Sequence, residues 1–283
     1  MASTSAKSFH IRSTSFPSKS HPNFARVQEC LHLVKVWEAC PSRKAQFVTR
    51  LGHLKDLYAS VNAFLQLPLT QQALCGKESL VRELMDDFLG LMDACGMLKD
   101  SLLHMREQHQ SLRSMLRRGD SGLEAGICAY QCSRKRMKKD MDKCLRLLRS
   151  VEKHASSSSD NLDVVDQVFK DVRAATISIF IHLSSIFSAK KATQSIFSRL
   201  LSSKNRDAEA DEDGVSEIEK ADITIFKLHD KPSKTVSQED ARDAQRQMEA
   251  LDVSLMETEV ELEDVLRCMI QAKVSLLNIV AGC

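Results

Sequence analysis

The side chains best suited to chemistry in this sequence are its thiols and imidazoles, and their spacing does not assemble a reaction centre. Cys128 and Cys132 lie four residues apart, so a helix would place both on one face. Two thiols leave a zinc site incomplete, and packing as small apolar side chains is the other interpretation. His104 and His109 lie five apart, a poor spacing for a shared metal on a helix. The sequence has no glycine-rich phosphate loop, no His-Glu-x-x-His and no Cys-x-x-Cys, so we expect no metal, no cofactor and no enzymatic activity.

A second chemical candidate is phosphorylation near the N-terminus. Arg12, Ser15 and Pro17 fit the pattern R-S-x-S-x-P, which adaptor proteins of the 14-3-3 class bind once the second serine is phosphorylated. Phosphate on Ser15 would offer up to about two negative charges to an arginine cluster, Arg12 would position it, and Pro17 would turn the chain out of the groove. Residues 1–22 are rich in Ser and Thr and lack acidic residues, so we expect a disordered tail. A plastid or mitochondrial transit peptide and a merely basic tail have the same composition, and all three interpretations stay open.

The third candidate is a basic cluster formed by Arg134, Lys135, Arg136, Lys138 and Lys139. Such clusters serve nuclear import, or bind nucleic acid or anionic lipid. A helix spreads consecutive residues around its circumference, so a solvated polar face is the other interpretation. The acidic stretch at residues 207–219 is available to neutralise the cluster within the fold. Because the net charge of +2 gives no global attraction to polyanions, we expect no nucleic-acid partner and keep a membrane surface as an alternative.

The spacing of apolar residues predicts the helices that must position these groups. In two long segments apolar residues alternate three and four positions apart, with only Thr258 interrupting the second series, which places one apolar stripe along a helix. The stripes are Val81, Leu84, Phe88, Leu91, Cys95, Leu98, Leu102 and Met105, continued by His109, Leu112 and Leu116, and Ala241, Ala244, Met248, Leu251, Leu255, Leu262, Val265, Met269, Ala272, Leu276 and Ile279. His109 in such a stripe is either a buried pH switch or a hydrogen-bonded core histidine. We expect an all-α, elongated bundle of about six mostly long helices.

We expect one domain over residues 23–283. Its longest helix should span residues 78–118, ~60 Å at 1.5 Å per residue. Pro68 should end an earlier helix, and Asn23 and either Asp160 or Asn161 are candidate N-caps. The helical period fails over residues 204–237, which are rich in Asp and Glu, so an acidic loop is expected before the final helix.

Cysteine usage and hydropathy bear on compartment and assembly. Nine cysteines without a secretory leader indicate free thiols in a reducing, cytoplasmic setting, with the nucleus or an organelle as alternatives. Residues 174–189 carry no charge but fall short of the ~20 apolar residues of a membrane span, which favours a buried core helix over a membrane-associated one. The last stripe would fit a two-stranded coiled coil, but further apolar residues widen it and favour burial in a monomeric bundle. These are Val260, Leu266, Ile270, Leu277 and Val280.

Several short segments resemble one plant family. They are Leu-Pro-Leu-Thr-Gln-Gln-Ala-Leu at residues 67–74, Leu-Gly-His-Leu-Lys-Asp-Leu-Tyr at 51–58, Leu-Met-Asp-Ala-Cys-Gly at 91–96 and the stretch from Tyr130 to Lys139. Together they resemble the plant family related to the BYPASS protein. The resemblance implies a helical fold, no known catalytic residues, and a role in root and shoot development through a long-distance root-derived signal. We therefore expect a non-enzymatic regulatory or scaffold protein. The alternatives are a peripheral membrane protein that binds anionic lipid through the basic helix, and an enzyme of signal metabolism without a recognisable motif.

Overall fold

The computed structural model describes residues 21–38, 47–118, 122–154, 163–188, 217–230 and 238–283. Within these ranges the chain forms eight helices and no strand: α1 (Pro22–Glu38), α2 (Phe47–Leu65), α3 (Pro68–Cys75), α4 (Glu78–Arg118), α5 (Leu123–His154), α6 (Val164–Ser188), α8 (Glu217–Asp230) and α9 (Gln238–Gly282). The predicted all-α class is confirmed, with two more helices than the six expected. The additional helices are the short α3 and α8.

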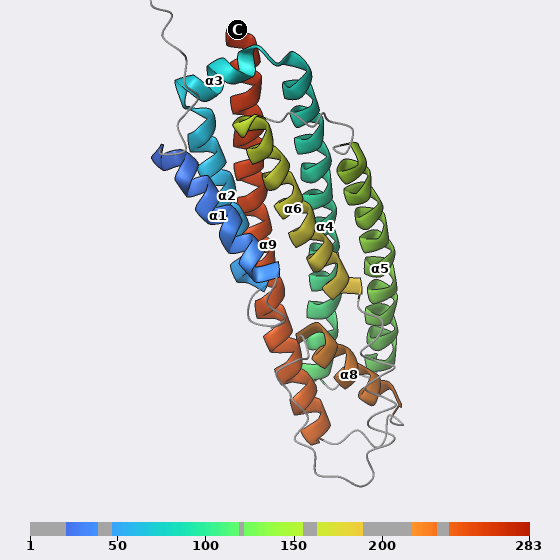
Figure 1. Cartoon of the computed structure of the whole chain (residues 1–283). Coiled ribbons are helices and arrows are strands. Elements are labelled where there is room, and N and C mark those ends of the chain that lie inside the picture. The colour runs from blue at the N-terminus through green and yellow to red at the C-terminus, as the bar shows by residue number, and fades with distance from the viewer. Residues whose placement is uncertain (1–20, 39–46, 119–121, 155–162, 189–216, 231–237) are drawn as a thin grey trace, which may run out of the picture.

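The helices form an elongated bundle whose central member is α9 (Figure 1). Helix α9 packs between α2 and α4, and α5 packs on the far side of α4. Helices α1 and α6 cover the front of this layer in the view of Figure 1, and α8 crosses one end. Helices α4 and α5 are antiparallel neighbours that only residues 119–122 separate in the sequence, and short connections favour antiparallel packing of long amphipathic helices.

Helix boundaries follow capping chemistry, with two corrections to the predicted caps. The backbone N–H of Asn23 donates to His21 Nδ1 at 3.2 Å, so His21 rather than Asn23 caps α1. Asp163 Oδ1 accepts from the backbone N–H groups of Val165 and Asp166 at 2.9 and 3.1 Å, and this places the N-cap of α6 after the two predicted candidates. Pro68 ends the previous helix as predicted and also opens α3, because the first turn of a helix tolerates its missing donor.

The core is built from the two predicted stripes. Nearly all of their members are buried on α4 and α9, and the exception is Ala241, which is half-buried. His109 is fully buried, and its Nε2 lies 2.6 Å from the carbonyl oxygen of Met248. Since a carbonyl only accepts, Nε2 must carry the proton, which supports the hydrogen-bonded core histidine. Tyr58 of α2 similarly donates to Thr176 of α6 at 2.9 Å, because the Thr176 hydroxyl itself donates to the carbonyl of Val172.

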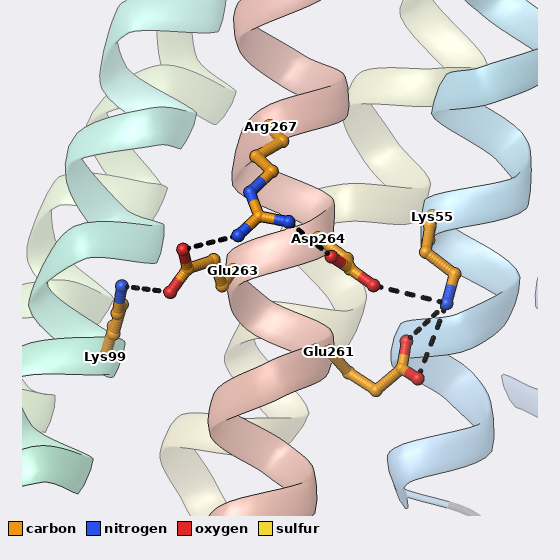
Figure 2. Close-up of polar contacts among 6 residues, drawn as sticks. All are labelled: Lys55, Lys99, Glu261, Glu263, Asp264 and Arg267. Carbon is orange, nitrogen blue, oxygen red and sulfur yellow. Dashed lines mark hydrogen bonds and ion pairs between the residues drawn. The ribbon is translucent and has the colours of Figure 1, made fainter.

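Ion pairs on both flanks of α9 set its register. Lys55 of α2 contacts Glu261 at 3.1 Å and Asp264 at 3.7 Å, while Lys99 of α4 contacts Glu263 at 2.7 Å (Figure 2). Two further basic residues, Arg106 and Arg113, follow Lys99 at intervals of seven and contact Glu259 and Glu249, both at 2.8 Å. These pairs place α4 antiparallel to α9. Water screens partly exposed pairs, so we assign them to alignment rather than to stability.

Three further expectations are corrected. Helix α8 occupies residues 217–230, where the sequence predicted acidic loop, because Ile218, Ala221, Ile225 and Leu228 bury an apolar face. Cys75 and Cys283 form a disulfide with Cα atoms 5.5 Å apart, so not every thiol is free. Four of the residues expected to widen the buried stripe of α9 are exposed instead: Val260, Ile270, Leu277 and Val280.

Residues 174–188 lie in α6, where most of their side chains are buried, in agreement with the core-helix interpretation. Among the described residues one helix, α9, is long and apolar enough to cross a membrane by length and composition. Core helices of water-soluble bundles pass the same test, and 28% of its most apolar 18-residue window is buried.

Candidate interaction surface

The sequence proposed two functional regions, and the structure describes one of them. Arg12, Ser15 and Pro17 lie outside the described residues. The basic cluster lies in the middle of α5, so the second candidate can be built from its contacts.

Arg134 does not belong to the surface cluster. Its side chain is 13% exposed and points inward, where Nη2 lies 2.8 Å from Asp222 of α8 and Nη1 donates to the carbonyl oxygen of Phe187 at 3.1 Å. The hydroxyl of Tyr130 donates to the same carboxylate at 3.0 Å. Burial lowers the pKa of Arg134, but the charge of Asp222 outweighs it and the pKa is raised overall. Burial and then Asp222 raise the pKa of Tyr130 well above its usual value. Arg134 therefore anchors α8 to α5, and the sequence-based assignment of this residue to a surface patch is wrong.

The other basic residues of the cluster extend into a longer surface. Lys135, Arg136 and Lys139 are exposed, and Lys138 is half-buried. The exposed side of the helix continues with Lys143, Arg146, Arg149 and Lys153. We call these seven exposed residues the α5 basic face: Lys135, Arg136, Lys139, Lys143, Arg146, Arg149 and Lys153. From its first to its last member the face extends ~27 Å along the helix axis.

The charge of this face is only partly neutralised by its surroundings. Helix α5 contains nine Lys and Arg residues against four Asp and Glu residues. Asp140 contacts Lys143 at 2.9 Å and Arg136 at 3.8 Å. The other five members make no ion pair with any residue that the structure describes: Lys135, Lys139, Arg146, Arg149 and Lys153. A row of exposed cations without an ion pair to the described residues is suited to binding an extended anionic surface.

A groove of about 730 Å³ runs beside this face, between α5 and α6. It is lined by eight residues of α6 and one of α5, both apolar and polar: Glu152, Lys170, Arg173, Ala174, Ile177, Ser178, Ile181, His182 and Ser185. Arg173 is already used inside the fold, because its guanidinium pairs with the buried carboxylate of Asp87 and lies 3.5 Å from Glu83. The groove therefore provides a concave, partly apolar surface, and the α5 basic face provides positive charge.

The cysteines and histidines considered for catalysis or metal binding do not form a cluster in the described part of the chain. Cys128 and Cys132 are both exposed on α5, and the described part of the chain holds no group of three or more potential metal ligands. Burial raises the pKa of Cys95 to about 12, so this thiol stays protonated and unreactive. Burial lowers the pKa of His109, which leaves it neutral at pH 7. Cys95 and His109 therefore serve packing in the bundle, whereas Cys128 and Cys132 are exposed and do not pack as the small apolar side chains that the sequence suggested.

The basic face was within reach of sequence reasoning, but the position of Arg134 was not. From Arg136 onward the six exposed cations recur every three to four residues, a spacing close to that of the apolar stripes, and Lys135 lies next to the first of them. The inward turn of Arg134 depends on Asp222, which lies 88 residues later. No local pattern marks such a pair.

Comparison with known protein families gives a match over most of the chain. A family model described as Protein BPS1 is similar to this chain over residues 50–279, which spans from α2 into the last turn of α9. No curated protein and no solved structure matches the chain.

Proposed function

Because the chain belongs to the Protein BPS1 family, we propose that it is a non-enzymatic plant regulatory protein that acts as a scaffold and binds an acidic protein partner along the α5 basic face. The resemblance to the BYPASS-related plant family is confirmed by the same match. The resemblance implies a role in root and shoot development, and we propose that the protein acts in that process. The unpaired charge of the α5 basic face is the observation that carries the proposed partner binding.

The distribution of charge elsewhere supports this choice of surface. Basic residues that lie between α2, α4 and α9 form ion pairs with carboxylates of α9, as Lys55, Lys99 and Arg113 do. Arg134 and Arg173 are likewise paired inside the bundle. Helix α5 differs, because most of its exposed cations have no described partner. An outside anion is one way to compensate them, and residues 207–216 of the acidic stretch that the sequence offered for this purpose lie outside the described residues.

A protein partner fits the surface better than a bilayer does. None of the exposed large apolar side chains lies on the described part of α5, so this face has nothing to insert below the lipid headgroups. Asp140 and Asp142 interrupt the row of cations and would be repelled by an anionic membrane. A folded partner can place its own charges around these two carboxylates, which a fluid lipid surface does less specifically.

The test is capture of partners from plant tissue with three forms of the full chain. The α5 variant carries Lys135→Gln, Lys139→Gln, Arg146→Gln and Arg149→Gln. A matched control removes the same charge from exposed residues of other helices, with Arg26→Gln, Lys227→Gln, Arg242→Gln and Arg246→Gln. We expect proteins with acidic segments to be lost from the α5 variant and retained by the control. Equal recovery by all three forms would refute the proposal.

Co-sedimentation with phosphatidylserine vesicles separates the rival function. The scaffold proposal predicts no binding at physiological ionic strength. Salt-sensitive binding that the α5 variant loses and the control keeps would instead establish the peripheral membrane protein.

We also propose that phosphorylated Ser15 recruits a 14-3-3 adaptor, on the strength of its spacing from Arg12 and Pro17. Ser15→Ala should remove 14-3-3 proteins from the captured set and leave the partners of α5 in place. Recovery of 14-3-3 proteins by the variant would exclude this site.

A further inference from the structure

Helix α9 has a second apolar face, opposite the one buried in the bundle. Seven of the twelve large apolar side chains exposed in the described part of the chain lie on this helix. Their exposed fractions run from 41% to 55%. We call them the outer face of α9: Val253, Met256, Val260, Ile270, Val274, Leu277 and Val280. Soluble monomers seldom expose so long an apolar row, and such rows commonly mark a contact surface.

The outer face is arranged as two mirror-related halves. Val253, Met256 and Val260 are spaced by three and then four residues. Ile270, Val274 and Leu277 are spaced by four and then three. Glu263 and Arg267 continue the spacing between the halves; Arg267 is exposed, and Glu263 is half-buried where it also contacts Lys99 of α4. The whole row therefore has the three-four repeat of a two-stranded coiled coil, with the charged residues Glu263 and Arg267 at its centre.

We propose that a second copy of this chain binds the outer face of α9, with the two α9 helices antiparallel. In this arrangement each apolar residue of one half meets an apolar residue of the other copy: Val253 with Leu277, Met256 with Val274, and Val260 with Ile270. Glu263 of each copy then meets Arg267 of the other, and the central charges are complementary. A parallel pair would instead place Glu263 against Glu263 and Arg267 against Arg267. Charge thus selects the antiparallel pair, whose twofold symmetry makes the surface self-complementary.

The chemistry of α9 favours a second copy over a lipid bilayer. Its inner face is held by the buried stripe, and its flanks are held by Lys55 and Lys99 (Figure 2). Insertion would require α9 to leave these contacts, or would carry Glu263 and Arg267 into the hydrocarbon region. A second α9 helix covers the apolar residues without disturbing the bundle, and it places opposite charges beside Glu263 and Arg267 in addition to their ion pair within each copy.

The size of the face indicates a reversible dimer. The row from Val253 to Val280 is ~40 Å long, and a helix ~10 Å wide gives a footprint of roughly 400 Å² on each copy. Specific interfaces commonly bury about 800 Å² on each partner. Even with contributions from the neighbouring surfaces of α2 and α4, the dimer should be weak enough to dissociate on dilution, with a dissociation constant in the micromolar range.

Sedimentation velocity of the full chain over about 1–200 μM tests the association. We expect a monomer–dimer equilibrium for the wild type. Val260→Glu combined with Ile270→Glu should weaken it at least about 100-fold, because like charges would then face each other in two layers. The matched control is Leu33→Glu with Val36→Glu, two residues of α1 exposed at 37% and 49% on a helix that packs on α2 and α6. A monomeric wild type over the whole range, or equal weakening by the control, would overturn the proposal.

Disulfide cross-linking tests the orientation. Val260→Cys and Ile270→Cys are prepared separately, oxidised alone and as a mixture, and compared with oxidised wild type to subtract native thiols. The antiparallel pair predicts a cross-linked dimer from the mixture and none from either variant alone. Self-linking of each variant would show a parallel pair and refute the model. A monomeric wild type that sediments with phosphatidylcholine vesicles would identify the outer face as a lipid contact instead and would equally refute it.

Discussion

Removal of the Asp222 carboxylate should destabilise the protein more than loss of any surface ion pair. Asp222 accepts from Arg134 Nε and Nη2 at 3.1 and 2.8 Å and from the Tyr130 hydroxyl at 3.0 Å. Asp222→Ala leaves the guanidinium with the Phe187 carbonyl and the weak thioether acceptors of Met105 and Met137, and it leaves the phenol without its acceptor. The two charged side chains are 13% and 15% exposed, so water cannot replace the lost carboxylate without opening the contact between α5 and α8.

The expected cost is about 3–5 kcal/mol, the range for breaking a buried pair from one side. That is a large part of the roughly 5–15 kcal/mol that stabilises a typical domain. Asp243→Ala is the control, because Asp243 is 52% exposed and lies 3.6 Å from Arg246 in the first turns of α9. It should change the free energy of unfolding by less than about 1 kcal/mol.

Urea unfolding followed by circular dichroism gives both values, and hydrogen exchange of α8 shows whether that helix detaches first. The triple variant Tyr130→Phe, Arg134→Met, Asp222→Leu removes every polar partner at once, so its stability should return to within about 1 kcal/mol of the wild type. An Asp222→Ala cost equal to that of Asp243→Ala would refute the buried pair. So would a triple variant less stable than Asp222→Ala.

Three further outcomes follow from single contacts in the structure. A methyl group added at Gly90 would lie 2.6 Å from a buried valine of α5, whereas one added at Gly96 meets nothing within 4 Å. Gly96→Ala should therefore stabilise α4 by about 0.5–1 kcal/mol, and Gly90→Ala should destabilise it by about 1–3 kcal/mol. Thermal unfolding of the two variants checks the sign of each change. Burial lowers the pKa of His109, so the unfolded chain binds more protons and the free energy of unfolding should fall as the pH drops below about 6.5. Urea midpoints at pH 7.5 and 5.5 should show a smaller fall for His109→Gln than for wild type, and equal slopes would contradict this reasoning. Reduction of the Cys75–Cys283 bond should lower the free energy of unfolding by about 2–5 kcal/mol. Cys75→Ser should have the stability of the reduced wild type, with or without dithiothreitol. A change in the stability of the variant on addition of reductant would show that the effect does not come from this bond.

The apolar period predicted the long helices because burial decides those positions and burial repeats with the helical turn. Helix α4 begins and ends where the spacing and the glycines that follow it indicate. Helix α8 has the same spacing through Ile218, Ala221, Ile225 and Leu228, but it has only 14 residues and follows an acidic stretch. A helix so short is stable mainly through what it packs against. Its existence therefore depends on α9 and on Arg134, which the local sequence does not reveal.

The spacing predicted the buried stripe of α9, but it did not predict that most of the apolar residues beside this stripe are exposed. Apolar residues occur around much of the circumference of α9 near its C-terminus, so the width of the buried face does not follow from the helical period alone. The positions of α2 and α4 decide this width. Lys55 and Lys99 bind carboxylates on either flank, and this leaves Val260 and Ile270 facing outward. The disulfide escaped prediction for the same reason, because 208 residues separate two cysteines that only the fold brings together.

The two proposed surfaces should reinforce each other. Helix α4 lies between α5 and α9, so a dimer formed through α9 leaves the α5 basic face of each copy uncovered (Figure 1). Two such faces on one particle would bind a partner with two acidic segments up to ~100-fold more tightly than one face does, if the partner can reach both. Val260→Glu with Ile270→Glu should therefore weaken binding to an immobilised two-site acidic probe and leave the affinity for a single-site acidic peptide unchanged. Equal loss for both probes would mean that the substitutions act on the fold of α5. No loss for either would mean that the two surfaces work independently.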